Sequence, residues 1–99
     1  MAGSPPAETG TRIVIAVIGR DRPGILAGVT GILAARGANI LDVSQTILSG
    51  LFTMIMIADI AASASPFADL KKELGEHGRG QGLSVMVQHE DLFRAMHRV

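Results

Sequence analysis

Within Val17-Ile18-Gly19-Arg20-Asp21-Arg22-Pro23-Gly24-Ile25-Leu26, the chain changes from a strand pattern to a helix pattern. The preceding segment, Arg12–Ile18, is an almost unbroken run of β-branched residues. Such a run predicts a strand that is apolar on both faces and lies inside a sheet. After Gly24 the apolar residues recur at the period of a helix. The charged residues between the two patterns therefore belong to a loop that connects a central strand to a helix.

The helix predicted over Gly24–Arg36 has recognisable boundaries. Pro23 suits the first turn of a helix, where a missing N–H has no cost. Asp21 is a candidate N-cap, which is compatible with a role in binding a ligand. Gly37 suits the left-handed residue that ends many helices. The apolar stripe of this helix consists of Ile25, Leu26, Val29, Ile32 and Leu33.

Two further strands form a hairpin. Asn39–Leu48 alternates apolar with polar residues, and its polar face predicts an edge strand. Ser49-Gly50 provides a two-residue turn. Leu51–Ala58 is apolar on both faces, which predicts a second central strand.

The rest of the chain repeats the order of helix and strand. Ser65-Pro66 predicts the start of a helix, with Ser65 as its N-cap. The apolar stripe of this helix is Phe67, Leu70 and Leu74, and the glycines predicted to end it are Gly78, Gly80 and Gly82. Leu83–Gln88 alternates and predicts an edge strand. Glu90–Arg98 predicts a short terminal helix with Leu92, Phe93 and Met96 on one side.

This order of elements predicts an α+β fold, a ferredoxin-like βαββαβ sandwich with a four-stranded antiparallel sheet, two helices on one face and a short C-terminal helix. Right-handed crossovers give the spatial order fourth, first, third, second strand. Both doubly apolar strands then lie in the middle. The face away from the two helices carries Val14, Ala16 and Ile18. We expect a partner subunit or the terminal helix to cover it.

The composition limits the possible functions. The 99 residues carry nine basic and nine acidic side chains, so we expect no electrostatic attraction to nucleic acid or to an anionic membrane. The chain has no Cys, which fits a cytoplasmic protein and excludes thiolate metal sites. Residues 1–10 are expected to be a disordered tail, and residues 11–99 a single domain with its last helix at about 90–98. No segment is long and apolar enough to predict a transmembrane helix.

The histidines give no sign of a metal site. His77, His89 and His97 are far apart in the sequence and lack the spacing of metal ligands. We therefore expect surface histidines, no metal and no cofactor.

The residues around the loop resemble the ACT domain, a small ferredoxin-like module often attached to enzymes of amino-acid metabolism. The resemblance covers about residues 12–89 and depends mainly on Asp21-Arg22-Pro23-Gly24-Ile25 and Gly37-Ala38-Asn39-Ile40. The chain is most similar to free-standing ACT proteins (UPF0237-like), through Asp42-Val43-Ser44-Gln45-Thr46, Phe52-Thr53-Met54 and a terminal helix.

The resemblance implies a ligand site between two subunits, in which the loop of one subunit meets the second strand of the other. On the loop side it marks Asp21, Arg22, Gly24, Ile25 and Leu26, and on the strand side Asn39 and Ile40. A helix N-terminus attracts a carboxylate, Asp21 can accept from an ammonium group, and Asn39 can donate and accept. Serine-binding ACT domains have a His in place of Gly19 and an Asn in place of Asp21, so the resemblance does not name the amino acid.

Two functions remain open from the sequence. The first is a regulatory, allosteric module that binds an amino acid or a similar small metabolite at a homodimer interface, with a metabolic enzyme or regulator as its partner. The second is a structural or interaction dimer without a ligand, which the uncovered sheet face favours. An enzyme is not expected, because no nucleophile and base can be paired from the sequence. RNA binding would require basic charge and aromatic residues on the sheet.

Overall fold

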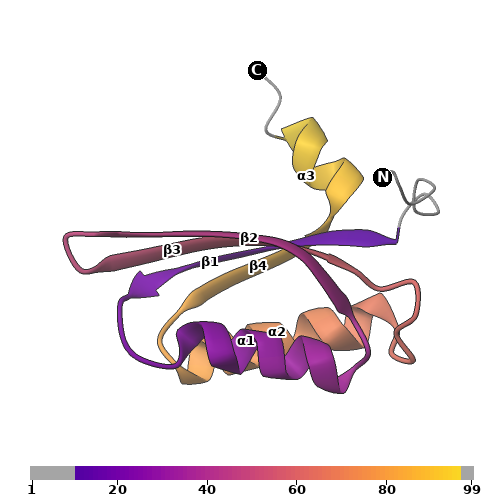
Figure 1. The fold of residues 1–99 in the computed structure, drawn as a ribbon, viewed down its shortest axis with the longest axis horizontal. Helices are drawn as coiled ribbons and strands as arrows, with labels where there is room; N and C mark the ends of the chain where they lie inside the picture. Colours follow the sequence, from indigo (N-terminus) through magenta and orange to yellow (C-terminus); the bar gives the residue numbers. More distant parts are fainter. Residues whose placement is uncertain (1–10, 97–99) are drawn as a thin grey trace.

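The computed structural model describes residues 11–96. Its elements follow the predicted order, including the predicted terminal helix (Figure 1). They are β1 (Arg12–Arg20), α1 (Ile25–Ala35), β2 (Asn39–Leu48), β3 (Leu51–Asp59), α2 (Phe67–Gly80), β4 (Ser84–His89) and α3 (Glu90–Met96). The predicted disordered tail, residues 1–10, lies outside the described residues. None of the helices within residues 11–96 is long and apolar enough to span a membrane.

The four strands form one antiparallel sheet in the order β2-β3-β1-β4. This confirms the predicted order, with the two doubly apolar strands β1 and β3 in the centre. Helices α1 and α2 lie together on one face of the sheet, and α3 rises from the opposite face (Figure 1). Ser49 and Gly50 both have positive φ angles, of 52° and 81°, as the predicted two-residue hairpin requires.

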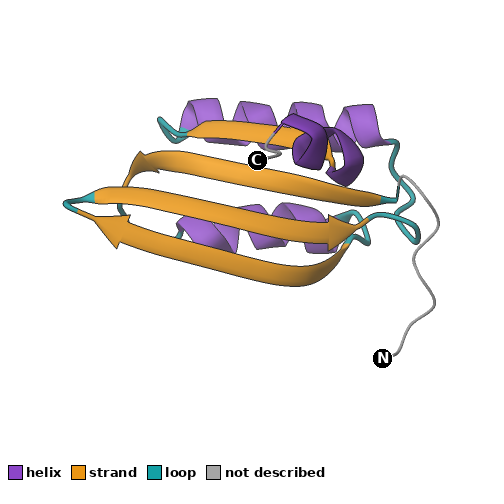
Figure 2. Ribbon diagram, turned by 90° about the horizontal axis from the view of Figure 1, so that it is seen from above, coloured by secondary structure: helices purple, strands orange, loops and turns teal. Residues whose placement is uncertain are grey.

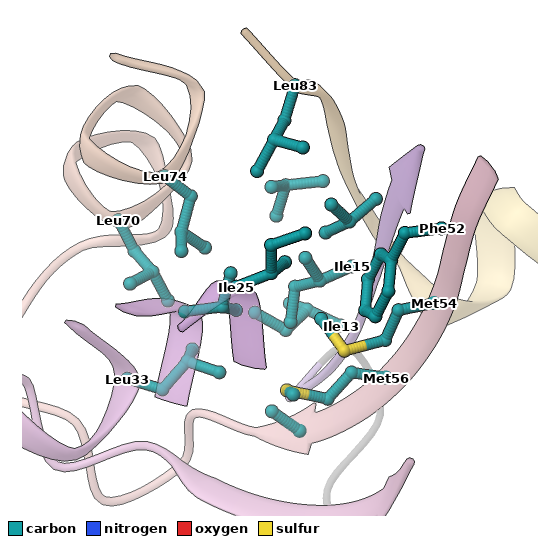
Figure 3. Packing of buried hydrophobic residues seen from close by; sticks show 14 residues of the cluster. Ile13, Ile15, Ile25, Leu33, Phe52, Met54, Met56, Leu70, Leu74 and Leu83 are labelled. Carbon is teal, nitrogen blue, oxygen red and sulfur yellow. The ribbon is translucent and has the colours of Figure 1, made fainter. Parts of the chain in front are cut away.

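The core lies between the sheet and the helix pair (Figure 3). Alternate residues of β1 point into it, and α1 contributes one residue per turn. Met54 and Met56 bring flexible side chains from β3, and Leu70 and Leu74 close the core from α2. The β1 and α1 residues in this core are Ile13, Ile15, Val17, Ile25, Val29 and Leu33. The alternation in the strands and the stripe in the helix therefore converge on one apolar layer.

Of the glycines predicted to end α2, Gly78 does not do so. The helix continues through Gly78 and ends at Gly80. A Cβ on Gly78 would lie 2.3 Å from Cγ2 of Val85, so glycine at this position lets α2 approach β4 closely. Its start also differs from the prediction, since Pro66 rather than Ser65 occupies the N-cap position and no side chain caps this end.

The polar loop after β1 is shorter than predicted. The strand continues through Gly19 and Arg20, which pair with Phe52 and Leu51 of β3. Gly19 fits there because a Cβ would come within 2.5 Å of the Leu83 side chain. The connection to α1 consequently begins at Asp21.

Candidate functional site

The loop between β1 and α1 is fastened to the β2–β3 hairpin. The main-chain N–H of Asp21 donates a 2.8 Å hydrogen bond to the carbonyl oxygen of Gly50. Gly50 adopts the left-handed conformation that turns its carbonyl out of the hairpin ladder. The loop therefore lies at the end of the sheet where β2 finishes and β3 begins.

Arg22 connects the same loop to a third segment. Its Nη2 donates to the main-chain carbonyl of Gln81 and, at 2.6 Å, to Oε1 of the same residue. Gln81 directly follows α2. The guanidinium thus links the loop to the α2–β4 connection and is already paired within the chain.

The N-terminus of α1 is open. Gly24 holds the N-cap position with φ 88°, and no side chain caps the helix. The predicted N-cap role of Asp21 is therefore wrong, because the left-handed turn at Gly24 separates that carboxylate from the helix end. The N–H of Gly28 bonds to the Gly24 carbonyl, so the three amides before it have no acceptor within the helix. An open N-terminus of this kind favours an anionic group.

The predicted strand side of the site lies far from the loop within one chain. Asn39 and Ile40 begin β2 and pair with Asp59 and Ala58 of β3. Asp59 is at the opposite end of β3 from Leu51, the partner of Arg20, and eight residues of strand span about 26 Å. One copy of the chain therefore brings Asp21, Arg22, Gly24, Ile25 and Leu26 together but keeps Asn39 and Ile40 apart from them.

Strand β2 is an exposed edge. Nine of its ten residues are exposed, and only Ile40 is half-buried. Asp42 is its one charged residue, and a register shift between Ile40 and Asp42 marks a bulge at its start. The strand has no Lys or Pro, the residues that commonly protect an edge from pairing with another chain. Its open row of main-chain groups is therefore available to a second strand.

A groove that the sequence analysis missed lies between α2 and β4, with a volume of about 490 Å³. Three cations line it on the helix side: Lys71, Lys72 and Arg79. Residues 84–88 of the other edge strand form its floor. The sequence held a signal for it, because Lys71, Gly75 and Arg79 share one face of a predicted helix beside a predicted edge strand.

The two described histidines are packing residues rather than free surface groups, which corrects the expectation for them. His89 stacks on Phe67 with ring centroids 4.0 Å apart. His77 lies against α1 at Gly28, where a Cβ would meet its Nε2 at 2.6 Å. His97 lies outside the described residues. Within residues 11–96, no group of three or more His, Cys, Asp or Glu side chains is arranged to hold a metal ion.

Comparisons with known proteins agree with the fold. The family model described as ACT domain matches residues 11–88. A UPF0237 protein of Methanocaldococcus jannaschii is 54% identical over 89 residues, which cover 90% of this chain and 99% of that protein. The structure of an ACT domain protein from Streptococcus pneumoniae is 34% identical with a TM-score of 0.72, covering 83% of this chain and 92% of that one.

A more distant structure shows the same fold. The ligand-free regulatory subunit of aspartate kinase from Thermus thermophilus is 22% identical with a TM-score of 0.61, covering 81% of this chain and 52% of that one. At this identity the likeness concerns the fold alone.

Proposed function

This chain belongs to the ACT-domain family. We propose that it is a non-enzymatic regulatory module that binds an amino acid or a similar small metabolite at a homodimer interface. ACT domains are typically small-molecule-binding regulatory modules, and relatives of nearly the same length share this chain's sequence almost from end to end. We further propose that residues 11–99 act as one domain in the cytoplasm.

The observation that carries the proposal is the hydrogen bond from Asp21 to Gly50. It places the loop beside the C-terminal end of β2, while Asn39 begins the same strand. If two β2 edges pair antiparallel about a two-fold axis, the start of each strand lies beside the end of the other. Asn39 and Ile40 of one copy then approach the loop of its partner, and the two halves that one chain keeps apart meet twice in the dimer.

The chemistry at this junction suits the two charged groups of an amino acid. The open N-terminus of α1 offers main-chain N–H groups and the positive end of the helix dipole to a carboxylate. Asp21 is exposed and offers a carboxylate to an ammonium group. Asn39 is exposed and adds an amide that donates and accepts. Ligand binding would stabilise one dimer geometry, which a metabolic enzyme or regulator would sense.

Calorimetric titration of the 99-residue protein with each common amino acid tests binding. We expect heat from one or a few of them, and loss of that heat in Asp21→Ala and in Asn39→Ala. Both residues are exposed, so these variants are expected to stay folded. An absence of heat across the whole set at millimolar concentration would refute the ligand and leave a dimer module without one.

Mixing the two variants tests whether the site is shared between subunits. In a mixed dimer, one site has both substitutions and the other has neither. After free exchange at equal concentrations, half of the dimers are mixed, so about a quarter of the wild-type sites return. Asp21→Ala mixed with itself is the control. A mixture that binds no more ligand than the separate variants contradicts a site built from two copies.

Proline substitutions test the β2 edge. Successive N–H groups of an edge strand point alternately toward β3 and toward the open edge. One of the variants Ser44→Pro and Gln45→Pro therefore keeps the β2–β3 ladder and removes only an edge donor. We call the variant that retains the wild-type circular dichroism spectrum the edge variant. We expect it to lose the β2 contact and with it ligand binding.

A further inference from the structure

Within residues 11–96, the outer face of the sheet, opposite α1 and α2, is covered by α3 at one corner only (Figure 2). Helix α3 contacts β1 and β4, and Val14 beneath it is 3% exposed. Beyond that corner the apolar side chains remain open to solvent. Their exposed fractions are 47% for Ile18, 47% for Leu51, 41% for Ile55 and 47% for Met86.

Ile18, Ile55 and Met86 lie close together, whereas Leu51 is separated from Ile55 by Thr53 and pairs with Arg20. Ala16 pairs with Met86 on one side and with Ile55 on the other, so the three lie in one row across neighbouring strands. Ile18 occupies the next row of the same face, two residues along β1. The nearest charged residues on this face, Arg20 and Asp42, lie at its rim, on the end of β1 and on the edge strand. The centre of the outer face is therefore the apolar row of Met86, Ala16 and Ile55. In the next row, Ile18 lies between the polar residues Ser84 and Thr53.

Helix α3 cannot cover this patch itself. It begins at Glu90, directly after β4 ends at His89, so no linker lets it move across the sheet. Gln88 Nε2 also lies 3.4 Å from the sulfur of Met96, which connects the far end of the helix back to β4. The flank of α3 is itself apolar, with Leu92 52% and Met96 54% exposed. The structure thus presents an open apolar floor and, at its corner, a helix with an open apolar side.

The size of this surface suits a second copy of the chain. Three rows across four strands measure about 20 by 19 Å, or about 400 Å² in projection. This area includes polar residues beside the apolar ones, namely Arg20, Ser44, Thr46, Thr53 and Ser84. The flank of α3 adds about 100 Å². Protruding side chains have more accessible surface than their projection, so the total approaches the roughly 800 Å² per partner of a standard interface.

We propose that a second copy of this chain covers the outer face in a back-to-back arrangement, separate from the β2 edge. Because α3 covers one corner and leaves the rest open, a two-fold axis through the middle of the face sets the partner's α3 over the open part. The two terminal helices then lie side by side in one layer between the two sheets. This arrangement buries Leu92 and Met96 together with Ile18, Ile55 and Met86. Combined with paired β2 edges, it makes a tetramer.

Sedimentation velocity of the full chain tests this contact. The outer-face variant is Ile55→Glu combined with Met86→Glu, at positions exposed enough to accept charge in the folded subunit. Ala68→Glu, at an exposed position on α2, is the matched control. We expect four times the chain mass of 10.3 kDa for the wild type and for Ala68→Glu. We expect half of that mass for the outer-face variant and for the edge variant, and single chains when both are combined. Circular dichroism confirms that each variant is folded.

The outcomes separate this contact from the proposed ligand site. If the wild type is a dimer that only the outer-face variant dissociates, the back-to-back contact stands and the β2 pairing fails. If the outer-face variant keeps the wild-type mass, the back-to-back contact is refuted whatever the edge variant does. A monomeric wild type also refutes it, and would assign the patch to a different protein.

Discussion

The main-chain N–H of Asp21 and the carbonyl of Gly50 are joined by a 2.8 Å hydrogen bond, so the loop that begins α1 and the turn that ends β2 form one structural unit. This unit sets the place of the loop relative to the β2 edge. A site shared between two copies requires the loop to be held at the end of the strand. If the loop were mobile, ordering it on binding would cost free energy and weaken the affinity for the ligand.

Removing this hydrogen bond should loosen the loop. Asp21→Pro deletes the N–H, and the residue before it lies in an extended strand, which proline tolerates. We expect a loss of about 1 kcal/mol in the free energy of unfolding and faster hydrogen exchange at the hairpin turn. Asp21→Ala keeps the N–H and should stay within about 0.5 kcal/mol of wild type. Equal exchange rates in both variants would show that the hydrogen bond does not hold the loop.

Two glycines of the α1 region should respond to alanine in opposite directions. Gly24 has φ 88° and Gly31 lies inside the helix, and a Cβ would meet nothing within 4 Å at either position. Gly24→Ala should lower the free energy of unfolding by about 1 kcal/mol, because an L residue is strained in this conformation. Gly31→Ala should raise it by about 0.5–1 kcal/mol through helix propensity. Thermal melting should show shifts of about 4–8 °C per kcal/mol. A stabilised Gly24→Ala would mean that the loop relaxes to another conformation.

The sequence predicted the strands and their order because a central strand has a recognisable pattern, an apolar run on both faces, within its own residues. The apolar runs around Ile15 and Met56 identify β1 and β3 without knowledge of any neighbour. Asp21 and Gly78 were assigned wrongly, because their roles depend on tertiary neighbours. The cap position belongs to Gly24, and Gly78 accommodates Val85 from the next strand.

In the candidate site, too, the sequence indicates some features, whereas others depend on contacts between distant segments. The resemblance marked its residues, but the pairing of Arg22 with Gln81 joins residues 59 positions apart and has no local signal. The attachment of the loop to the hairpin at Gly50 has no local signal in the sequence either. A pattern along one strand or helix predicts which face is buried, whereas a contact between two turns follows only from the assembled fold.

Arg22 should hold the loop without adding much to global stability. Its two hydrogen bonds to Gln81 are exposed, so Arg22→Ala should cost less than about 1 kcal/mol in the free energy of unfolding. Hydrogen exchange should nevertheless accelerate at residues 21–24 and 81–83 together. Arg20→Ala, an exposed cation two residues earlier, is the control and should leave both segments unchanged. Acceleration at only one of the two segments would show that the side chain does not couple them.

The close approach of α2 to β4 makes Gly78 the most sensitive glycine of α2. A Cβ there would lie 2.3 Å from Cγ2 of Val85 and 3.3 Å from the carbonyl of Leu83. Gly78→Ala should therefore destabilise the protein by about 1–3 kcal/mol, because the helix must move away from the sheet. Gly75→Ala is the control, since its nearest neighbour is the flexible end of Arg79 at 3.5 Å. It should stabilise the helix by about 0.5–1 kcal/mol.

A double-mutant cycle with Val85→Ala identifies the cause of this destabilisation. Val85→Ala removes the atom closest to the new Cβ, although Cβ of residue 85, at 3.1 Å, and the Leu83 carbonyl remain. We expect Gly78→Ala to cost about 1 kcal/mol less in that background than in wild type, measured by urea unfolding. If the cost is the same in both backgrounds, the clash with Cγ2 of Val85 is not its source, and the remaining contacts, with Cβ of residue 85 and with the Leu83 carbonyl, limit how closely α2 can approach β4.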